Sequence, residues 1–369
     1  MFTEHLSVLP TRDHALHRQR RAVLHRFFSQ QNVRRLVPVI NDTLANLLAR
    51  MEGWATDGGP VSLNAAYRAA AKDVIQAYAL GDGRRCLDMH DCNAAYFDVL
   101  AAERLTHDLS AKISRIRNSS DDSPGGTIFH EILRSNISVE EKSTPRLVDE
   151  AMVLTIAGSD TTASTLVALT YHILSTPSIF ARLRAELDAA IPSPDQAPDP
   201  KALDALPFLN ALIEEALRMY PSATHRQDRV APDTDLLYTS PSGSRILIPR
   251  GTIIGMTAPL LNRSPQLYTS PDTFSPDRYL DNPALKHTHF TFGAGARKCL
   301  GLNLAYQELQ TFTAGVFRKY AVFDPQKADQ GGPTMQLFET GIEDVRLHAD
   351  YVTPGLRPGG KGVRVVIRH

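Results

Sequence analysis

Cysteine is scarce in this chain of 369 residues, which contains only Cys86, Cys92 and Cys299. Three cysteines are too few for the disulfide framework that stabilises many small secreted domains. The Cys-x5-Cys pair formed by Cys86 and Cys92 has no second pair at metal-ligand spacing, so a zinc site there is disfavoured. Cys299 lies far from both in the sequence and therefore needs an explanation of its own.

Charge of one sign and long apolar runs are also lacking. The 40 Lys and Arg residues balance 40 Asp and Glu residues, so no global charge indicates a nucleic-acid partner. No segment approaches the roughly 18 consecutive apolar residues of a transmembrane helix, and Met1–His5 lacks the apolar region of a signal peptide. We therefore expect a soluble or peripheral protein that does not bind nucleic acid.

What is present is a hydrophobic periodicity typical of helices. It predicts helices over residues 16–28, 32–51, 63–80, 94–115, 144–175, 179–190, 207–219 and 302–320. Strands are expected at 236–238 and 245–248, which flank turn residues and predict a hairpin, and at 252–256 and 362–367. No linker divides the chain. We therefore expect one domain over residues 1–369, mainly α with small β-sheets (α+β).

The segment Phe292–Gly301 places Cys299 in a glycine-rich loop, behind Arg297 and ahead of an apolar helix. Glycines let the main chain turn tightly and approach a flat cofactor, and a thiolate is one of the axial ligands of haem iron. A buried structural cysteine is the alternative interpretation. The pattern Phe-x-x-Gly-x-Arg-x-Cys-x-Gly is fully matched and resembles the haem-binding signature of the cytochrome P-450 family. The resemblance implies haem b, with Cys299 as the axial ligand, Phe292 beside the sulfur, Arg297 on a propionate and Gly301 against the haem.

Glycine and hydroxyl residues interrupt the longest predicted helix at 157–162. Such residues lower helix propensity, and their hydroxyls bond back to the preceding turn, so we expect a local bulge beside Asp160 and Thr161. A regular helix with a surface aspartate and packed threonines is the alternative. The segment resembles the family's oxygen-activation motif, which implies that Thr161 steadies dioxygen through a hydrogen bond and that Asp160 relays protons.

Glu215 and Arg218 are three residues apart on the 207–219 helix and share a face. An exposed pair of this kind contributes only a few tenths of a kcal/mol. Arg278, however, lies in a segment that resembles the family sequence whose arginine joins such a pair. The resemblance therefore implies a buried structural network of Glu215, Arg218 and Arg278 that locks the core around the cysteine loop and has no catalytic role.

Further cations are expected at the haem propionates. Arg229 follows the Glu-x-x-Arg helix, where the family often has a propionate arginine. His17 and Arg21 lie four residues apart on one helix face and resemble the Trp/His-x-x-x-Arg pattern of a helix that binds the propionates. The same basic segment is also consistent with a solvated helix face or with a docking surface for an acidic electron donor. For docking, the candidates are Arg18, Arg20 and Arg26.

The resemblance runs from about Leu16 to the C-terminus. In the family this helix follows a sizeable N-terminal region, so the resemblance implies a cytochrome P-450 fold that lacks its N-terminal anchor, first helix and first strands. We expect an unpaired sheet edge and a partly open substrate channel as a result. Family members are anchored in the endoplasmic-reticulum membrane, whereas this chain is expected to be soluble or peripheral on the cytoplasmic side.

The resemblance implies a monooxygenase that inserts one oxygen atom from O2 into a small, largely apolar organic substrate, as fungal microsomal members of secondary metabolism do. Electrons would come from NADPH-cytochrome P-450 reductase, or from cytochrome b5, because the chain has no Gly-x-Gly-x-x-Gly dinucleotide loop. We expect a monomer whose substrate pocket is lined by segments 97–113, 151–157 and 222–227. Two alternatives are a haem-thiolate isomerase or dehydratase, against which Asp160 and Thr161 argue, and a truncated product without catalytic activity.

Overall fold

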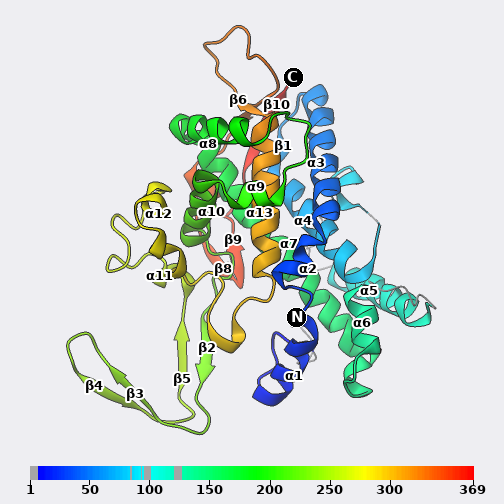
Figure 1. Cartoon of the computed structure of the whole chain (residues 1–369), viewed down its shortest axis with the longest axis vertical. Helices are drawn as coiled ribbons and strands as arrows, with labels where there is room; N and C mark the ends of the chain where they lie inside the picture. Colours follow the sequence, from blue (N-terminus) through cyan, green and yellow to red (C-terminus); the bar gives the residue numbers. More distant parts are fainter. Residues whose placement is uncertain (1–6, 84, 93, 95–100, 120–126) are drawn as a thin grey trace.

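A computed structural model describes residues 7–83, 85–92, 94, 101–119 and 127–369 and shows a mainly helical protein with small sheets (Figure 1). This confirms the fold class expected from the sequence. The α-helices are α1 (His14–His25), α2 (Gln30–Arg34), α3 (Val37–Asp57), α4 (Leu63–Leu80), α5 (Ala101–Asn118), α6 (Ile128–Arg134), α7 (Thr144–Ser175), α8 (Pro177–Ala190), α9 (Pro200–Asp204), α10 (Pro207–Met219), α11 (Ala258–Leu261), α12 (Asp277–Asp281) and α13 (Leu302–Lys319). Short 3-10 helices are η1 (Cys86–Asp88), η3 (Glu140–Lys142), η4 (Pro283–His287), η5 (Gly295–Arg297) and η6 (Ile342–Asp344).

The strands form one four-stranded sheet and three two-stranded ribbons. They are β1 (Val61–Ser62), β2 (Gln227–Val230), β3 (Leu236–Thr239), β4 (Arg245–Ile248), β5 (Ile253–Met256), β6 (Ala321–Val322), β7 (Thr334–Leu337), β8 (Ala349–Tyr351), β9 (Thr353–Gly355) and β10 (Arg364–Arg368). The larger sheet has the order β1-β10-β7-β6, with β6 parallel to β7 and the other pairs antiparallel. The ribbons pair β2 with β5, β3 with β4, and β8 with β9.

The centre of the core is α7, which packs against α4, α5, α10 and α13. A proline in its first turn favours its start, and Pro177 follows its end. Within the described residues, α7 is long and apolar enough to cross a membrane, but 56% of its most apolar stretch is buried inside the protein. A buried helix at the centre of a globular core has the same composition, so this helix is weak evidence for a membrane span.

Two helix predictions differ substantially from the structure, whereas others, such as 16–28 for α1 and 179–190 for α8, differ by up to three residues at an end. The helix expected over 32–51 is divided into α2 and α3, because Pro38 has no N–H to continue a preceding helix and instead occupies the first turn of α3. The helix expected over 94–115 corresponds to α5, which begins at Ala101. Residues 95–100, which include the start of one predicted pocket segment, lie outside the described residues.

The predicted hairpin at 236–248 is present as β3 and β4, and Figure 1 shows it projecting from the helical body. The ribbons β2–β5 and β3–β4 carry large apolar side chains that are exposed. They are Val230, Leu236, Leu237, Tyr238, Ile246, Leu247, Ile253 and Met256. Within the described part of the chain, neither β2 nor β5 has a second neighbouring strand.

The β8–β9 hairpin has a strained tip. Val352 adopts a φ of 75°, a left-handed conformation that is unfavourable for a β-branched residue. Its carbonyl accepts a hydrogen bond from the Thr224 amide at 3.1 Å, and its own amide donates to the Asp350 carboxylate at 2.9 Å. These bonds fix the hairpin tip to the segment that follows α10.

Candidate active site

The loop before α13 holds Cys299 through main-chain hydrogen bonds. The Cys299 amide donates to the Phe292 carbonyl at 2.8 Å, which closes the loop on itself. Gly293 and Gly295 have φ values of 64° and 66°, a region that residues with a Cβ rarely adopt. The amide of Gly301, the N-cap of α13, donates a hydrogen bond to the sulfur. The local geometry therefore follows from the glycine spacing of the sequence.

Cys299 is accessible to solvent although it lies deep among protein groups. Its side chain is exposed, yet burial raises the pKa of the thiol, while the Gly301 amide and the charges of Arg21 and Lys298 act to lower it. The other two cysteines are buried. Within the described residues, no cluster of three or more His, Cys, Asp or Glu side chains could hold a metal ion. Only Cys299 combines accessibility with amide donors and nearby cations.

Phe292 contacts two aromatic rings, those of His289 and Tyr306, which both form hydrogen bonds with the Glu214 carboxylate. Its ring centroid is 5.5 Å from that of Tyr306 and 6.2 Å from that of His289. The Tyr306 hydroxyl donates to Glu214 at 2.6 Å, and His289 Nε2 lies 2.8 Å from the other carboxylate oxygen. Glu214 is buried on α10, beside Glu215. This arrangement fixes the ring at the start of the cysteine loop.

Four predicted propionate-binding residues come together from three distant parts of the chain. The charges of Arg297 and Arg21 act on His17, and those of Arg229 and Arg21 act on Arg297. Burial, followed by these like charges, lowers the pKa of His17 to about 4, and the same causes lower the pKa of Arg297. Helix α1, strand β2 and the cysteine loop thus direct a shared positive field at one region.

This cation cluster has no carboxylate partner within the described residues. Arg297 donates only to the Arg12 carbonyl at 3.4 Å, and Arg229 donates to the Asp228 carbonyl and to Gln227. Like charges held together without a counter-charge form a site for anions. Two propionates beside a thiolate would meet this requirement, so the donor set fits haem b.

Gly301 gives an independent test of that fit. A Cβ built at this position meets no protein atom within 4 Å, so the packing of the protein does not itself require glycine here. Its φ of −83° is also open to any residue. Close approach of a flat cofactor to the main chain would explain the glycine at position 301, which the packing of the protein does not explain.

The residues expected to handle oxygen lie midway along α7. The Thr161 hydroxyl donates to the Ala157 carbonyl at 2.8 Å, and Ser159 donates to Thr155 at 2.6 Å, so the hydroxyls bond back to the preceding turn as expected. The expected bulge is absent, because α7 is α-helical throughout. Gly158 explains the difference: a Cβ there would lie 2.9 Å from Ile75, so the glycine allows α4 to pack closely rather than breaking the helix.

Asp160 is paired with a residue that sequence reasoning missed. Its carboxylate lies 2.6 Å from Arg68 Nε on α4, and only 16% of its side chain is exposed. Burial raises the pKa of Asp160, while Arg68 acts to lower it. The pairing was not visible in the sequence, since 92 positions separate two residues that the packing of α4 on α7 brings together.

A second missed residue connects the cysteine loop to the oxygen motif. Glu308 is 1% exposed on α13 and forms a hydrogen bond with Thr162, the neighbour of Thr161. Burial raises the pKa of Glu308 well above its usual range, while the hydrogen bond with Thr162 acts to lower it. It lies six residues after Leu302, about 9 Å along the helix. The contact between Glu308 and Thr162 therefore joins the middle of α7 to the first half of α13, the helix that follows the cysteine loop.

The Glu215 network brings together the three residues expected from the sequence. Arg218 donates to Glu215 through two bonds of 2.8 Å, and Arg278 Nε lies 3.1 Å from each carboxylate oxygen. Arg218 also donates to the carbonyls of Asn262 and Pro271. The side chains of Glu215 and Arg218 are fully buried.

Arg20, one of the three candidates for docking an electron donor, is buried. Arg20 is 8% exposed and forms an ion pair with Glu141, so it cannot contact an electron donor. Arg26 is exposed but paired with Glu131, and Arg18 is exposed beside His14. Helical periodicity alone could not separate these residues, because the partner acids lie more than a hundred positions away.

Comparisons with known proteins show the family of the chain. The sequence profile described as Cytochrome P450 matches residues 101–338. The chain is 35% identical to the cytochrome P450 monooxygenase tpcC of Cochliobolus heterostrophus, over 98% of this chain and 76% of the relative. It is 32% identical to the cytochrome P450 monooxygenase astB of Talaromyces wortmannii, with the same coverage. A third relative is the N-acetyltryptophan 6-hydroxylase ivoC of Emericella nidulans, at 29% identity over 100% of this chain and 77% of the relative.

The fold and these relatives define a haem-thiolate oxidoreductase. The chain belongs to the cytochrome P450 family, whose members bind haem b through a cysteine thiolate. It is a monooxygenase, similar to fungal enzymes of secondary metabolism, and uses O2, a redox partner and an organic substrate.

Proposed function

We propose that Cys299 is the axial ligand of haem b and that His17, Arg21, Arg229 and Arg297 bind its propionates. The observation that carries this proposal is the convergence of three arginines and His17, without a described counter-charge, beside the one exposed cysteine. When bound, haem with a thiolate ligand supplies the electron density that favours O–O bond cleavage. Phe292 and Gly301 complete the site, the first by limiting access of water and the second by allowing close approach.

In this proposal Asp160 and Thr161 hold and move protons for the reaction. The Thr161 proton is committed to the Ala157 carbonyl, so its oxygen is free to accept a hydrogen bond from a protonated reactant or from water. Asp160 Oδ1 is held by Arg68 Nε, and its raised pKa allows it to take up and release a proton. Arg68 is then a positioning residue that decides where the carboxylate points.

We further propose that the substrate is small and largely apolar. We assign segment 222–227 to the substrate pocket because Ser222 donates to the Thr161 carbonyl at 3.0 Å, which sets that segment directly against the oxygen motif. Segment 151–157 lies on the same helix one turn earlier, and Ala157 is exposed. The naming of one relative as a hydroxylase of N-acetyltryptophan is consistent with a substrate that has polar groups as well.

The remaining features of the proposal concern the setting of the reaction. Residues 1–369 form one haem domain that acts as a monomer at the cytoplasmic side of the endoplasmic reticulum. Its electron donor is NADPH-cytochrome P-450 reductase, with cytochrome b5 as a second donor. Reconstitution of the purified chain with each donor, followed by substrate-dependent NADPH consumption, distinguishes them.

A reduced, CO-bound spectrum tests the ligand assignment. The wild-type protein should show the thiolate-type Soret band, and Cys299→Ser should lose it while Cys92→Ser retains it. A Cys299→Ser protein with an unchanged band would refute the assignment. For the proton pathway, Asp160→Asn should lower kcat about 10²-fold with the spectrum unchanged, and an unaffected kcat would remove Asp160 from the mechanism.

A further inference from the structure

Helix α1, which carries His17 and Arg21, has little helical stability of its own. It has 12 residues, and isolated helices of that length are marginal in water. Its sequence contains no carboxylate, and His17 and Arg21 are a like-charged pair at i and i+4 when His17 is protonated. The position of α1 therefore depends on contacts with the rest of the protein.

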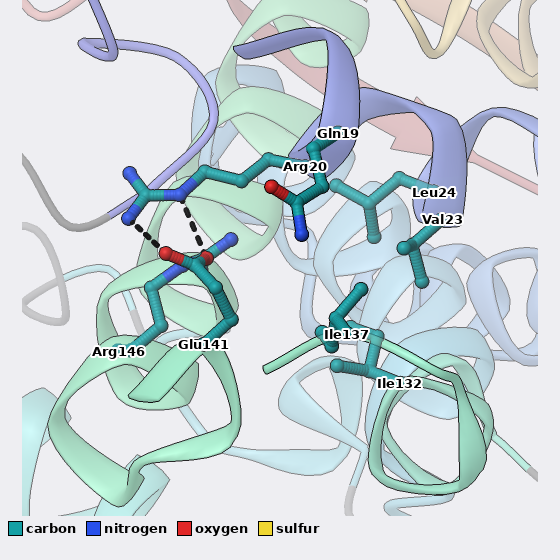
Figure 2. A pocket seen from close by; sticks show the side chains of 8 residues that line it. All are labelled: Gln19, Arg20, Val23, Leu24, Ile132, Ile137, Glu141 and Arg146. Atoms are coloured by element: carbon teal, nitrogen blue, oxygen red, sulfur yellow. Dashed lines mark hydrogen bonds and ion pairs between the residues drawn. The ribbon is translucent and has the colours of Figure 1, made fainter. Parts of the chain in front are cut away.

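The strongest of these contacts is a buried, bidentate ion pair. Arg20 donates from Nε to Glu141 Oε2 at 2.8 Å and from Nη2 to Glu141 Oε1 at 2.6 Å, and its third nitrogen donates to Thr11 at 2.9 Å. Figure 2 shows the two bonds to Glu141, with Arg146 approaching the same carboxylate from the other side. Side chains of Arg20 and Glu141 are only 7% and 12% exposed.

The network continues from Glu141 into the first turns of α7. Arg146 Nε donates to Glu141 at 3.0 Å, and Arg146 Nη1 lies 2.6 Å from Glu150, which is fully buried. Glu150 also accepts a hydrogen bond from the Val8 amide at 3.0 Å. Arg20, Glu141, Arg146 and Glu150 alternate in charge and join the N-terminal segment, α1 and α7; we call these four residues the Glu141 network.

The Glu141 network counteracts the electrostatic repulsion between Arg21 on α1 and Arg297 in the cysteine loop. His17 and Arg21 flank Arg20 in the sequence and share with it one side of the helix. Burial and then the like charges of Arg229 and Arg21 lower the pKa of Arg297, so Arg21 on α1 and Arg297 in the cysteine loop repel each other. A helix this short would relax away from the other cations unless another contact held it.

We propose that the Glu141 network is a positioning device for haem, which holds α1 against its own repulsion so that His17 and Arg21 meet the propionates in place. The inference rests on the proposed haem site. It predicts that Glu141, although it has no contact with the cation cluster, determines how firmly that cluster retains its anion. Buried ion pairs are often neutral for stability, so this role accounts for charges that stability alone does not explain.

The rate of haem loss from the holoprotein to excess apomyoglobin tests the proposal by absorbance. Glu141→Gln removes the shared acceptor charge and should accelerate haem loss about 10-fold, since it leaves Arg20 and Arg146 without their common partner. In an Arg21→Gln background the same substitution should accelerate loss by less than about 3-fold, because positioning matters less when the positioned charge is absent. Arg26→Gln, which breaks the exposed pair with Glu131 at the end of α1, is the matched control and should leave the rate unchanged.

Purely additive effects of Glu141→Gln and Arg21→Gln would overturn the proposal, since they would show that Glu141 acts through general stability. If Glu141→Gln does not fold, Arg20→Lys is tested in its place. This substitution keeps the charge but removes the bidentate geometry. A wild-type rate of haem loss in Arg20→Lys would also overturn the proposal. If instead Arg21→Gln and Arg297→Gln leave the rate unchanged, the haem site itself is wrong. Faster hydrogen exchange of α1 amides in Glu141→Gln, with α13 unchanged, is expected in support.

Discussion

Replacing Glu215 by glutamine tests how much of the fold depends on one buried carboxylate. The carboxylate accepts two bonds from Arg218, two from Arg278 and one from the Ser275 amide at 2.8 Å. Glutamine has nearly the same shape, but it carries no charge and presents an amide group to these donors. The substitution therefore removes the counter-charge while leaving the volume of the side chain unchanged.

The magnitude follows from the burial of the partner. Arg218 is fully buried, and with Glu215 neutral its guanidinium retains only main-chain carbonyls such as Asn262 and Pro271 as partners. Breaking a buried pair in this way costs about 3–5 kcal/mol. A typical domain has only about 5–15 kcal/mol of stability in total. We therefore expect Glu215→Gln to lose between about a fifth and all of its stability, and with it much of its haem.

Urea unfolding of the haem-loaded protein measures this loss. Asp277→Asn is the matched control, because Asp277 neighbours Arg278 on α12 but forms an exposed pair with Arg182, with side chains 53% and 50% exposed. That pair should contribute less than about 1 kcal/mol. If Glu215→Gln and Asp277→Asn lose the same small amount, the reasoning that burial makes the Glu215 network essential is refuted.

Three further substitutions test separate features. The pKa of His17 is lowered to about 4 in the folded protein from 6.5, so the unfolded chain binds more protons between these values. The free energy of unfolding of the haem-free protein should therefore fall by up to about 2 kcal/mol from pH 7.5 to pH 5. His17→Gln should remove this pH dependence, which urea titrations measure. Gly158→Ala places a Cβ 2.9 Å from Ile75 and should destabilise by about 1–2 kcal/mol despite the better helix propensity of alanine, which thermal unfolding measures; a raised Tm would show that α4 can move away. Val352→Gly should gain about 1 kcal/mol by relieving the left-handed φ, and a loss would indicate that the valine side chain packs usefully.

The sequence predicted local structure well and long-range partners poorly. The 63–80 and 144–175 helices were located to the residue, because periodicity and flanking prolines or glycines define such boundaries. The bulge at Gly158 was wrong, since a glycine that permits close packing has the same sequence signature as one that breaks a helix. The partners of Asp160 and Arg20 could not be predicted, because Arg68 and Glu141 meet them only through the packing of α4, α1 and α7.

Motif resemblance predicted groups of residues that spacing alone could not. Nothing in the local sequence of His17 links it to Arg229 or Arg297, yet the structure brings their charges together. Glu308 shows the complementary limit: it lies on the helix after the cysteine loop, but only the fold reveals that burial raises the pKa of its carboxyl group. Charge at a helical position is visible in a sequence, whereas its protonation state requires the fold.

The β3–β4 hairpin has a practical consequence for work with this protein. Leu237 and Leu247 are cross-strand partners, and they are 52% and 64% exposed on a ribbon that projects from the body. An apolar pair presented to water in this way adheres to other apolar surfaces, including detergent micelles and further copies of the chain. Light scattering from such assemblies would distort a haem spectrum. Replacing Leu237 by threonine and Leu247 by lysine places a β-branched residue in the ribbon. The double variant should give clearer samples without altering any residue of the haem site.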